Sequence, residues 1–252
     1  MLARSHWPMV RAVAWRNVRL RYKSSFLGFF WTLLNPLLFL VIFLLIFSEA
    51  FPNVENYPVF ALSGLIFWSF FATSSAHIMG ALVENASVLR SLSVPPMVFP
   101  LAQLLAGLFN LFMSFIPFAI ILHLFGREPH LTDLLVIPVV ACFGAFIFGI
   151  SLALSALNVF FRDIGLLWNA LLPAFFYITP IAYPAELIPD RMRWIIEVNP
   201  LYQFIGAFRE VLYHGRVPGQ EQWLLLVGLA LLTSLVGGYS YKLLRPGFIA
   251  NY

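Results

Sequence analysis

Residues 21–47 read RYKSSFLGFFWTLLNPLLFLVIFLLIF, a basic lead-in followed by a long apolar run. After Lys23 the chain carries no Asp, Glu, Lys or Arg until Glu49, and a second uncharged run separates Asp133 from Arg162. Both runs exceed the roughly 20 apolar residues that a helix needs to cross a bilayer. The sequence therefore predicts helices that cross a membrane.

The composition of the whole chain also indicates a membrane protein. Of 252 residues, 61% are hydrophobic and 10% are charged, and the mean hydropathy is +0.88. Globular domains carry about 25% charged residues. The apolar stretch 26–47 is longer than the roughly 7–15 residues of a signal-peptide core, so we expect it to remain as a span. We interpret residues 1–252 as a single all-α, polytopic transmembrane domain.

Six transmembrane helices are predicted from the apolar runs. They lie near residues 26–47, 58–83, 97–125, 134–160, 164–183 and 222–241. With the N-terminus inside, the cytoplasmic segments hold ten Lys and Arg residues and the external segments hold five, in agreement with the positive-inside rule. We therefore expect both termini in the cytoplasm. Residues 1–25 precede the first span, 26–183 hold spans one to five, and 242–252 form the cytoplasmic tail.

The N-terminal segment predicts an amphipathic helix on the inner membrane surface. Between Trp7 and Lys23 apolar residues recur every three or four positions, while Arg16, Arg19 and Lys23 recur at that spacing on another face. Such a basic face meets anionic lipid headgroups. Two roles stay open for residues 1–25: an anchor that sets orientation, or a docking surface for a cytoplasmic partner.

Polar residues enter the first and fifth spans on one face of each helix. The first span contributes Gly28, Thr32, Asn35 and Phe39, and the fifth contributes Asn169, Phe176 and Tyr177. Pro36 in the first span also removes a helical hydrogen bond. Polar, kinked backbone is tolerated at membrane depth where it faces protein or a water-filled cavity. We expect these residues to line a wet translocation channel, with a dry packing kink as the alternative.

Stripes of small and polar residues follow the third and fourth spans as well. The third span has Gln103, Gly107, Asn110 and Ser114 at steps of four, three and four. Small and polar residues allow close approach and hydrogen bonding between membrane helices. We interpret these stripes as packing surfaces between helices.

Residues 184–221, between the fifth and sixth spans, predict short re-entrant or interfacial helices at the outer face. Asn199 suits an N-cap and Pro200 suits the first helical position. The helix that follows is too short to cross a bilayer. Two roles stay open for this segment, a plain lid and an exit gate. The candidate gate residues are Tyr183, Asn199, Pro200, Phe204 and Phe208.

Motifs that would supply chemistry or energy are missing from the sequence. It contains no G-x-x-x-x-G-K-[ST], no H-E-x-x-H and no G-x-S-x-G. No charged residue lies deep in a predicted span, which disfavours an ion-coupled carrier. We therefore expect no catalytic residue, metal or cofactor in this chain, and energy supplied by another polypeptide. An intramembrane enzyme and a non-transporting scaffold subunit are the alternatives from other classes.

Four blocks of the sequence carry a family resemblance. They are RYKSSFLGFFWTLLNPL (21–37), ENASVLRSLSVPPMVFPLA (84–102), NVFFRDIGLLWNALLPAFFYITPIAYP (158–184) and IIEVNPLYQFIGAFREVLYHG (195–215). Together they resemble the permease subunit of type-2 ABC exporters. The closest branch exports lipid-linked polysaccharides such as O-antigen, capsule and teichoic acid. A drug or lipid exporter of the same superfamily is the alternative.

The resemblance implies partners, location and roles for particular residues. It implies a homodimer in the bacterial cytoplasmic (inner) membrane, two copies of a separate ATP-binding subunit that hold ATP and Mg²⁺, and a lipid-linked glycan as cargo. Besides membrane lipids, no further partner is implied, and nucleic acid is not expected. The first and fifth spans of both protomers would enclose the channel, and the outer short helices would gate it. The loop that resembles the ATPase coupling helix contains Asn85, Val88, Leu89 and Leu92.

Overall fold

The computed structural model describes residues 6–23, 30–47, 51 and 54–251, and all regular elements in these ranges are helices. The α-helices are α1 (Trp7–Tyr22), α2 (Phe30–Phe47), α3 (Tyr57–Glu84), α4 (Ala86–Ser91), α5 (Val98–Leu124), α6 (Val136–Phe160), α7 (Asp163–Ile178), α8 (Arg193–Glu197), α9 (Pro200–Leu212), α10 (Gln220–Leu244) and α11 (Phe248–Asn251). Short 3₁₀ turns are η2 (Leu131–Leu135), η3 (Ala185–Leu187), η4 (Asp190–Met192) and η5 (Arg245–Gly247). The predicted all-α class is confirmed for the described residues.

Within the described ranges, four helical segments are long and apolar enough to cross a bilayer. They are Tyr57–Ser91, Val98–Leu124, Leu131–Phe160 and Gln220–Asn251, and they match the second, third, fourth and sixth predicted spans. The fifth predicted span is shorter than expected, because α7 has 16 residues and ends at Ile178. Helix α2 has 18 residues and continues through Pro36, while residues 24–29 lie outside the described residues. The six-span topology therefore stays a prediction.

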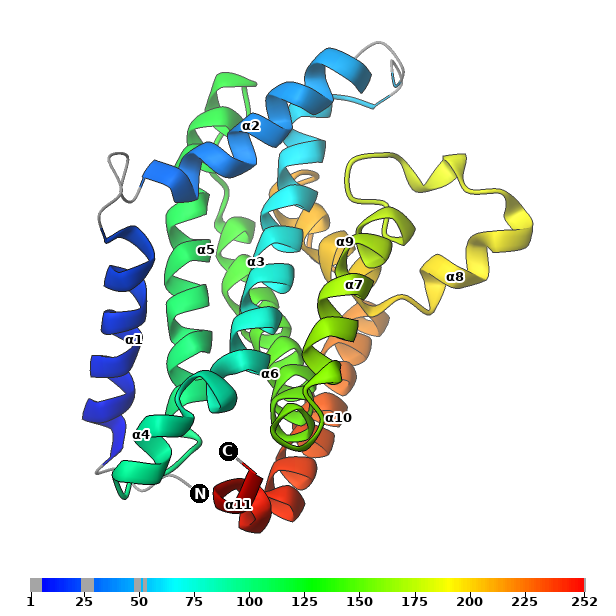
Figure 1. The fold of residues 1–252 in the computed structure, drawn as a ribbon. Helices are drawn as coiled ribbons and strands as arrows, with labels where there is room; N and C mark the ends of the chain where they lie inside the picture. The colour runs from blue at the N-terminus through cyan, green and yellow to red at the C-terminus, as the bar shows by residue number, and fades with distance from the viewer. Residues whose placement is uncertain (1–5, 24–29, 48–50, 52–53, 252) are drawn as a thin grey trace.

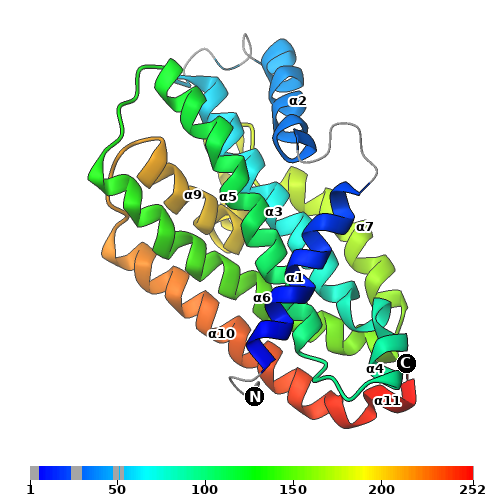
Figure 2. The ribbon, with the colours of Figure 1, turned by 90° about the vertical axis from the view of Figure 1, so that its left-hand side faces the viewer.

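Helix α3 stands at the centre of the bundle and packs on both α5 and α6 (Figure 1). Helix α10 runs along α6, and α1 lies across α5 on the opposite side (Figure 2). The start of α1, the short helix α4 and the C-terminal α11 lie at one end of the bundle. Turn η2 and the C-terminal end of α9 lie at the other end.

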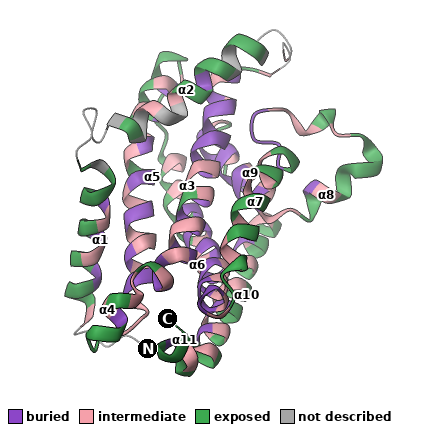
Figure 3. Ribbon diagram, viewed as in Figure 1, coloured by how far each residue is buried: buried purple, intermediate pink, exposed green. Residues whose placement is uncertain are grey.

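Aromatic rings from distant parts of the chain form the centre of the core. The Phe143 ring lies 5.1 Å from that of Phe67 and 4.8 Å from that of Phe204, measured between ring centroids. Phe67, Phe143, Phe204 and Phe208 are all fully buried. Figure 3 shows that burial concentrates on α3, whereas α7 and α10 are largely exposed. Helix α9 thus packs into the bundle although it is too short to span it.

Helices α6 and α10 approach closely because glycines face each other between them. A Cβ atom built on Gly237 would overlap the carbonyl oxygen of Gly149, and one on Gly149 would overlap the backbone of Thr233. Small residues permit such backbone contact between membrane helices, where packing rather than water exclusion drives association. These two glycines therefore determine the distance between α6 and α10.

Candidate functional site

The predicted channel residues lie on α2 and α7, which are separate in a single protomer. Helix α2 packs on α3 and α5, whereas α7 packs on α3 and α6. On α7, the side chains of Asn169 and Tyr177 are exposed, and Phe176 packs edge-on against Trp68 at 5.4 Å. Helix α7 has no buried residue. The outer face of α7 is therefore exposed in a single protomer. Helices α2 and α7 of one protomer do not enclose a channel between them.

The predicted channel residues of the first span are only partly described. Phe39 on α2 is exposed. Gly28 and the side chains of Thr32 and Asn35 lie outside the described residues. Their place in a channel wall stays a prediction.

Helix α1 carries the three predicted basic residues on its exposed sides. Its apolar residues Val10, Ala14 and Val18 are buried, the first two together with Val98 and Ala102 of α5. The Arg19 guanidinium lies 5.0 Å from the centre of the Trp15 ring, and Lys23 is exposed. Val10 and Ala14 thus form an apolar face that contacts α5, and the predicted position of α1 on the inner membrane surface stays a prediction.

The predicted coupling loop forms the six-residue helix α4, and its residues differ in exposure. Leu92, directly after α4, is 58% exposed, and Val88 is partly buried. Leu89 is 7% exposed and packs in a core cluster with Leu82 and Phe99. Leu89 is therefore a core residue in this conformation, and its part in a contact with an ATPase stays a prediction. Periodicity over six residues could not show which side of the turn faces the bundle.

Asn85 connects α4 to the N-terminal helix. Its Nδ2 donates to the Ala81 carbonyl oxygen at 2.8 Å, and its Oδ1 accepts from Arg16 Nη2 at 3.2 Å. Arg16 Nη2 also donates to Asn17 Oδ1 at 3.3 Å. The structure thus brings together two residues that the sequence placed in separate sites, one on the interface helix and one in the coupling loop.

A polar cavity of about 650 Å³ lies between α1, α3 and α5. Its polar lining from α3 and α5 includes Ser69, Thr73, Ser74, His77, Gln103, Asn110 and Ser114. Arg16, Arg21, Glu84 and Asn85 also line it. The stripe on the third predicted span was interpreted as a packing surface, but it forms a wall of this cavity. Gly107 of that stripe also acts as a packing residue, since a Cβ there would overlap Ser74 Oγ, and Asn110 and Ser114 are buried.

Residues 183–221 contain the predicted cap and two predicted gate residues that are buried. Asn199 Oδ1 accepts from the Leu201 backbone N–H at 3.0 Å, so Asn199 caps α9, with Pro200 in the first turn. Tyr183 Oη donates to the Tyr177 carbonyl oxygen at 2.7 Å. Phe204 and Phe208 are fully buried core residues, so they do not face a passage in this conformation. Their place on the apolar side of α9 accounts for this burial, and a role in a gate stays a prediction.

Arg209 on α9 is the residue that sequence reasoning missed. Its side chain is 7% exposed and donates to Ser63 Oγ at 3.3 Å, to the Pro180 carbonyl oxygen at 3.0 Å and to the carbonyl oxygens of Phe60 and Ile181. Its Cζ also lies 3.7 Å from the centre of the Phe60 ring. Burial lowers the pKa of Arg209 to about 9, so it stays protonated at neutral pH.

Arg209 joins three segments through these contacts. They are α9 itself, the N-terminal part of α3 and the turn 179–182 after α7. Asn199 Nδ2 adds a 2.9 Å bond to Thr179 Oγ1, and Tyr57 Oη adds a 2.9 Å bond to the Ala182 carbonyl oxygen. The signal in the sequence was the four-residue spacing from Ile205, which places Arg209 on the apolar side of α9.

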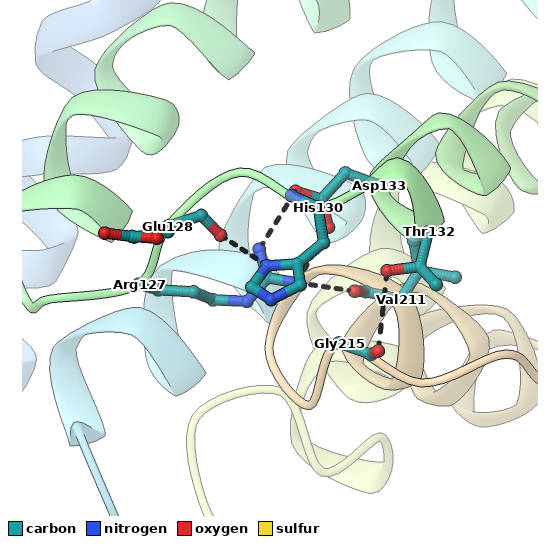
Figure 4. A network of polar contacts seen from close by, with 7 residues as sticks. All are labelled: Arg127, Glu128, His130, Thr132, Asp133, Val211 and Gly215. Atoms are coloured by element: carbon teal, nitrogen blue, oxygen red, sulfur yellow. Dashed lines mark hydrogen bonds and ion pairs between the residues drawn. The ribbon is translucent and has the colours of Figure 1, made fainter.

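A second polar network fixes the far end of α9 (Figure 4). Arg127 pairs with Asp133 through two bonds of 3.2 and 2.7 Å, and it also donates to the Val211 carbonyl oxygen at 2.9 Å. The backbone N–H of His130 donates to Asp133 Oδ2 at 3.0 Å. Bidentate Arg–carboxylate pairs are strong and geometrically specific. The loop between α5 and α6 is therefore tied to the C-terminal end of α9.

Comparison with known proteins identifies the family. A family model described as ABC-2 type transporter matches residues 9–213. This chain belongs to the ABC-2 type transporter family. The match begins in α1 and ends just after α9, so it includes α4, α7 and the Arg209 contacts.

Relatives of this ABC-2 chain include named polysaccharide transport proteins. It is 34% identical over 237 residues to "O-antigen export system permease protein RfbA" of Klebsiella pneumoniae, which covers 92% of this chain and 90% of the relative. A protein of the same name from Myxococcus xanthus is 29% identical over 221 residues, covering 86% and 85%. "Polysialic acid transport protein KpsM" of Escherichia coli is 25% identical over 244 residues, covering 92% of both chains. The resemblance to polysaccharide-exporting ABC permeases is confirmed.

Proposed function

We propose that this chain is the channel-forming permease of an ATP-driven exporter that moves a lipid-linked, O-antigen-like polysaccharide across the bacterial inner membrane. The observation that carries this proposal is the near full-length match to O-antigen export permeases at 34% identity. The all-helical, apolar architecture of the described residues fits a transport component. No contact, cavity or motif described above specifically favours a drug or lipid exporter, an intramembrane enzyme or a scaffold.

The topology proposed with this function has six spans and both termini in the cytoplasm. The start of α1 and the helix α11 share one end of the bundle, which agrees with an even number of crossings (Figure 1). Helix α4 lies at that same end and would face an ATP-binding partner. Arg90 of α4 and Leu92 directly after it are exposed and could contact such a partner.

The proposed channel needs a second copy of this chain. Helix α7 packs on α3 and α6 with one face, and its other face exposes the polar residue Asn169 and the amphipathic residue Tyr177. A second protomer across α7 and α2 would enclose these side chains in a shared path. Sugar hydroxyls lose several kcal/mol if they are buried unpaired in apolar surroundings, so such a path would retain water. Aromatic rings such as Tyr177 would contact the apolar faces of sugars without fixing their register.

Complementation tests the proposed function. A strain that lacks its O-antigen export permease would receive this chain together with its ATP-binding partner subunit. We expect glycan to return to the cell surface, measured by surface labelling of intact cells. The same pair with an inactive ATP-binding protein should leave the glycan inside. Normal folding of both proteins without surface glycan would contradict the proposed cargo.

Cysteine labelling tests the proposed topology separately from the cargo. In a Cys142→Ala background, Gly219→Cys should react with an impermeant thiol reagent applied to sealed cells. Ser87→Cys on α4 should react only after the cells are opened. Both positions are exposed, so a difference reports the side of the membrane rather than burial. Labelling of Ser87→Cys in sealed cells would overturn the topology.

A further inference from the structure

The cavity between α1, α3 and α5 has a cationic part formed by α1. Arg16 and Arg21 line it together with one carboxylate, Glu84, so the lining has more positive than negative charge. Among the described residues, Arg16 donates to the amide oxygens of Asn17 and Asn85, which carry no charge, and it forms no ion pair. Guanidinium groups bind phosphate oxygens through paired, charge-assisted hydrogen bonds. This part of the cavity therefore fits an anionic group.

The deeper part of the cavity offers neutral polar groups. Ser74 is 2% exposed, and its Oγ has no hydrogen-bond partner among the residues that the structure describes. Gly107 lies against that hydroxyl, and Gln103 lines the same cavity one helical turn away. A buried hydroxyl without a partner is unfavourable, so the oxygen of a bound molecule or of water would stabilise it.

Apolar side chains complete the lining. Trp31, Ile66 and Phe70 border the same space as the polar groups, and Leu20 of α1 does so beside the arginines. Phe70 and Ile66 belong to α3, which is long and apolar enough to span the membrane. A molecule that fills the cavity therefore needs both an anionic polar part and an apolar part.

We propose that this cavity binds the phosphate headgroup of a membrane lipid. Arg16 and Arg21 bind the phosphate oxygens, and Ser74 and Gln103 contact polar groups next to the phosphate. The first carbons of the lipid chains pack beside Trp31 and Ile66. Because Arg16 also bonds Asn85, an occupied cavity holds α1 against the start of α4.

Two lipids of the membrane share this chemistry, an anionic phospholipid and a polyprenyl phosphate carrier. The binding site itself rests on the cavity and not on the cargo. Only its assignment to a polyprenyl carrier rests on the proposed function in glycan export. A binding assay without ATPase and without glycan therefore separates the two claims.

Native mass spectrometry of the full-length protein in detergent tests the site. The probes are phosphatidylglycerol, a polyprenyl phosphate, and diacylglycerol as a lipid without phosphate. We expect the two phosphate lipids to bind and diacylglycerol not to bind. Arg16→Gln combined with Arg21→Gln should weaken phosphate-lipid binding by about tenfold. The matched control combines Arg11→Gln and Arg245→Gln, which remove the same charge at exposed positions outside this cavity, and it should stay within about twofold of the wild type.

A second variant covers the case in which the double arginine change prevents folding. Ser74→Ala removes only the unpartnered hydroxyl and should weaken binding by about threefold. Stronger binding of the polyprenyl phosphate would identify the glycan carrier as the ligand, and stronger binding of phosphatidylglycerol would identify a resident lipid. Three results would overturn the proposal. The control pair could lose as much phosphate-lipid binding as the Arg16 and Arg21 pair, or the cavity variants could bind phosphate lipids as the wild type does. The third result is that diacylglycerol binds as well as the phosphate lipids. Failed glycan export would leave these binding results unaffected.

Discussion

Arg209 shows how one side chain can join three segments of this permease. It is the buried cation through which α9 holds the N-terminal part of α3 and the turn 179–182. All its hydrogen-bond acceptors are neutral oxygens, so the fold satisfies the charge with dipoles rather than with a carboxylate. Such an arrangement depends on the complete set of acceptors, because each unpaired buried polar group is costly.

Replacing Arg209 with Met should therefore lower stability strongly. The change leaves the carbonyl oxygens of Pro180 and Ile181 without their donor, at a cost of about 3 kcal/mol. Thermal unfolding of the purified protein measures this loss. Arg191→Met is the control, since Arg191 is exposed on the same external segment. Equal unfolding temperatures for the two variants would show that the Arg209 contacts do not stabilise the fold.

At the scale of helices, the α6–α10 pair depends on close backbone contact. Gly237 faces Gly149, whereas a Cβ on the neighbouring Gly238 would meet nothing within 4 Å. Gly237→Ala should separate the two helices and cost about 1–3 kcal/mol through overpacking. Gly238→Ala should leave stability unchanged or slightly higher, because Ala favours helix more than Gly does. The measurement is folded yield and unfolding temperature; similar losses in both variants would contradict the proposed interhelical contact.

Helix α4 offers a second test at this scale, because Leu89 and Leu92 differ in burial. Leu89→Asp places a charge in the core cluster and should prevent folding. Leu92→Asp changes an exposed side chain, so the protein should fold and insert. If α4 contacts an ATPase, co-purification of that partner with Leu92→Asp should fall severalfold. Full recovery of the partner and full export in Leu92→Asp would exclude Leu92 from the contact.

At the scale of the whole molecule, the uncovered faces of α7 and α10 should differ in what surrounds them. If α7 borders a wet path between protomers, Asn169→Asp should assemble nearly normally and change export. Leu232→Asp places a charge on the exposed side of α10, which would face lipid and cost about 2.5–3.5 kcal/mol on insertion scales. Folded dimer yield and surface glycan measure the two effects. Equal loss of folded protein in the two variants would mean that water does not reach the α7 face that carries Asn169.

The sequence by itself determined the features that depend on neighbouring residues along the chain. The four long apolar helices lie where their uncharged runs predicted them, because run length decides whether a helix can span a bilayer. Asn199 caps α9 because a cap needs only its own first turn. The family resemblance likewise rests on four blocks of sequence, which occur along this chain in the same order as in the family.

Only the tertiary structure decided which face of each helix meets protein. In a membrane, lipid is as apolar as the core, so hydrophobicity does not show whether Leu89, Phe204 or Leu232 is buried. The polar stripe around Gln103 became a cavity wall because α1 lies across α5. Arg209 became a core residue because carbonyl oxygens from the turn after α7 and from α3 converge on it. These contacts join segments far apart in sequence, and no local pattern contains them.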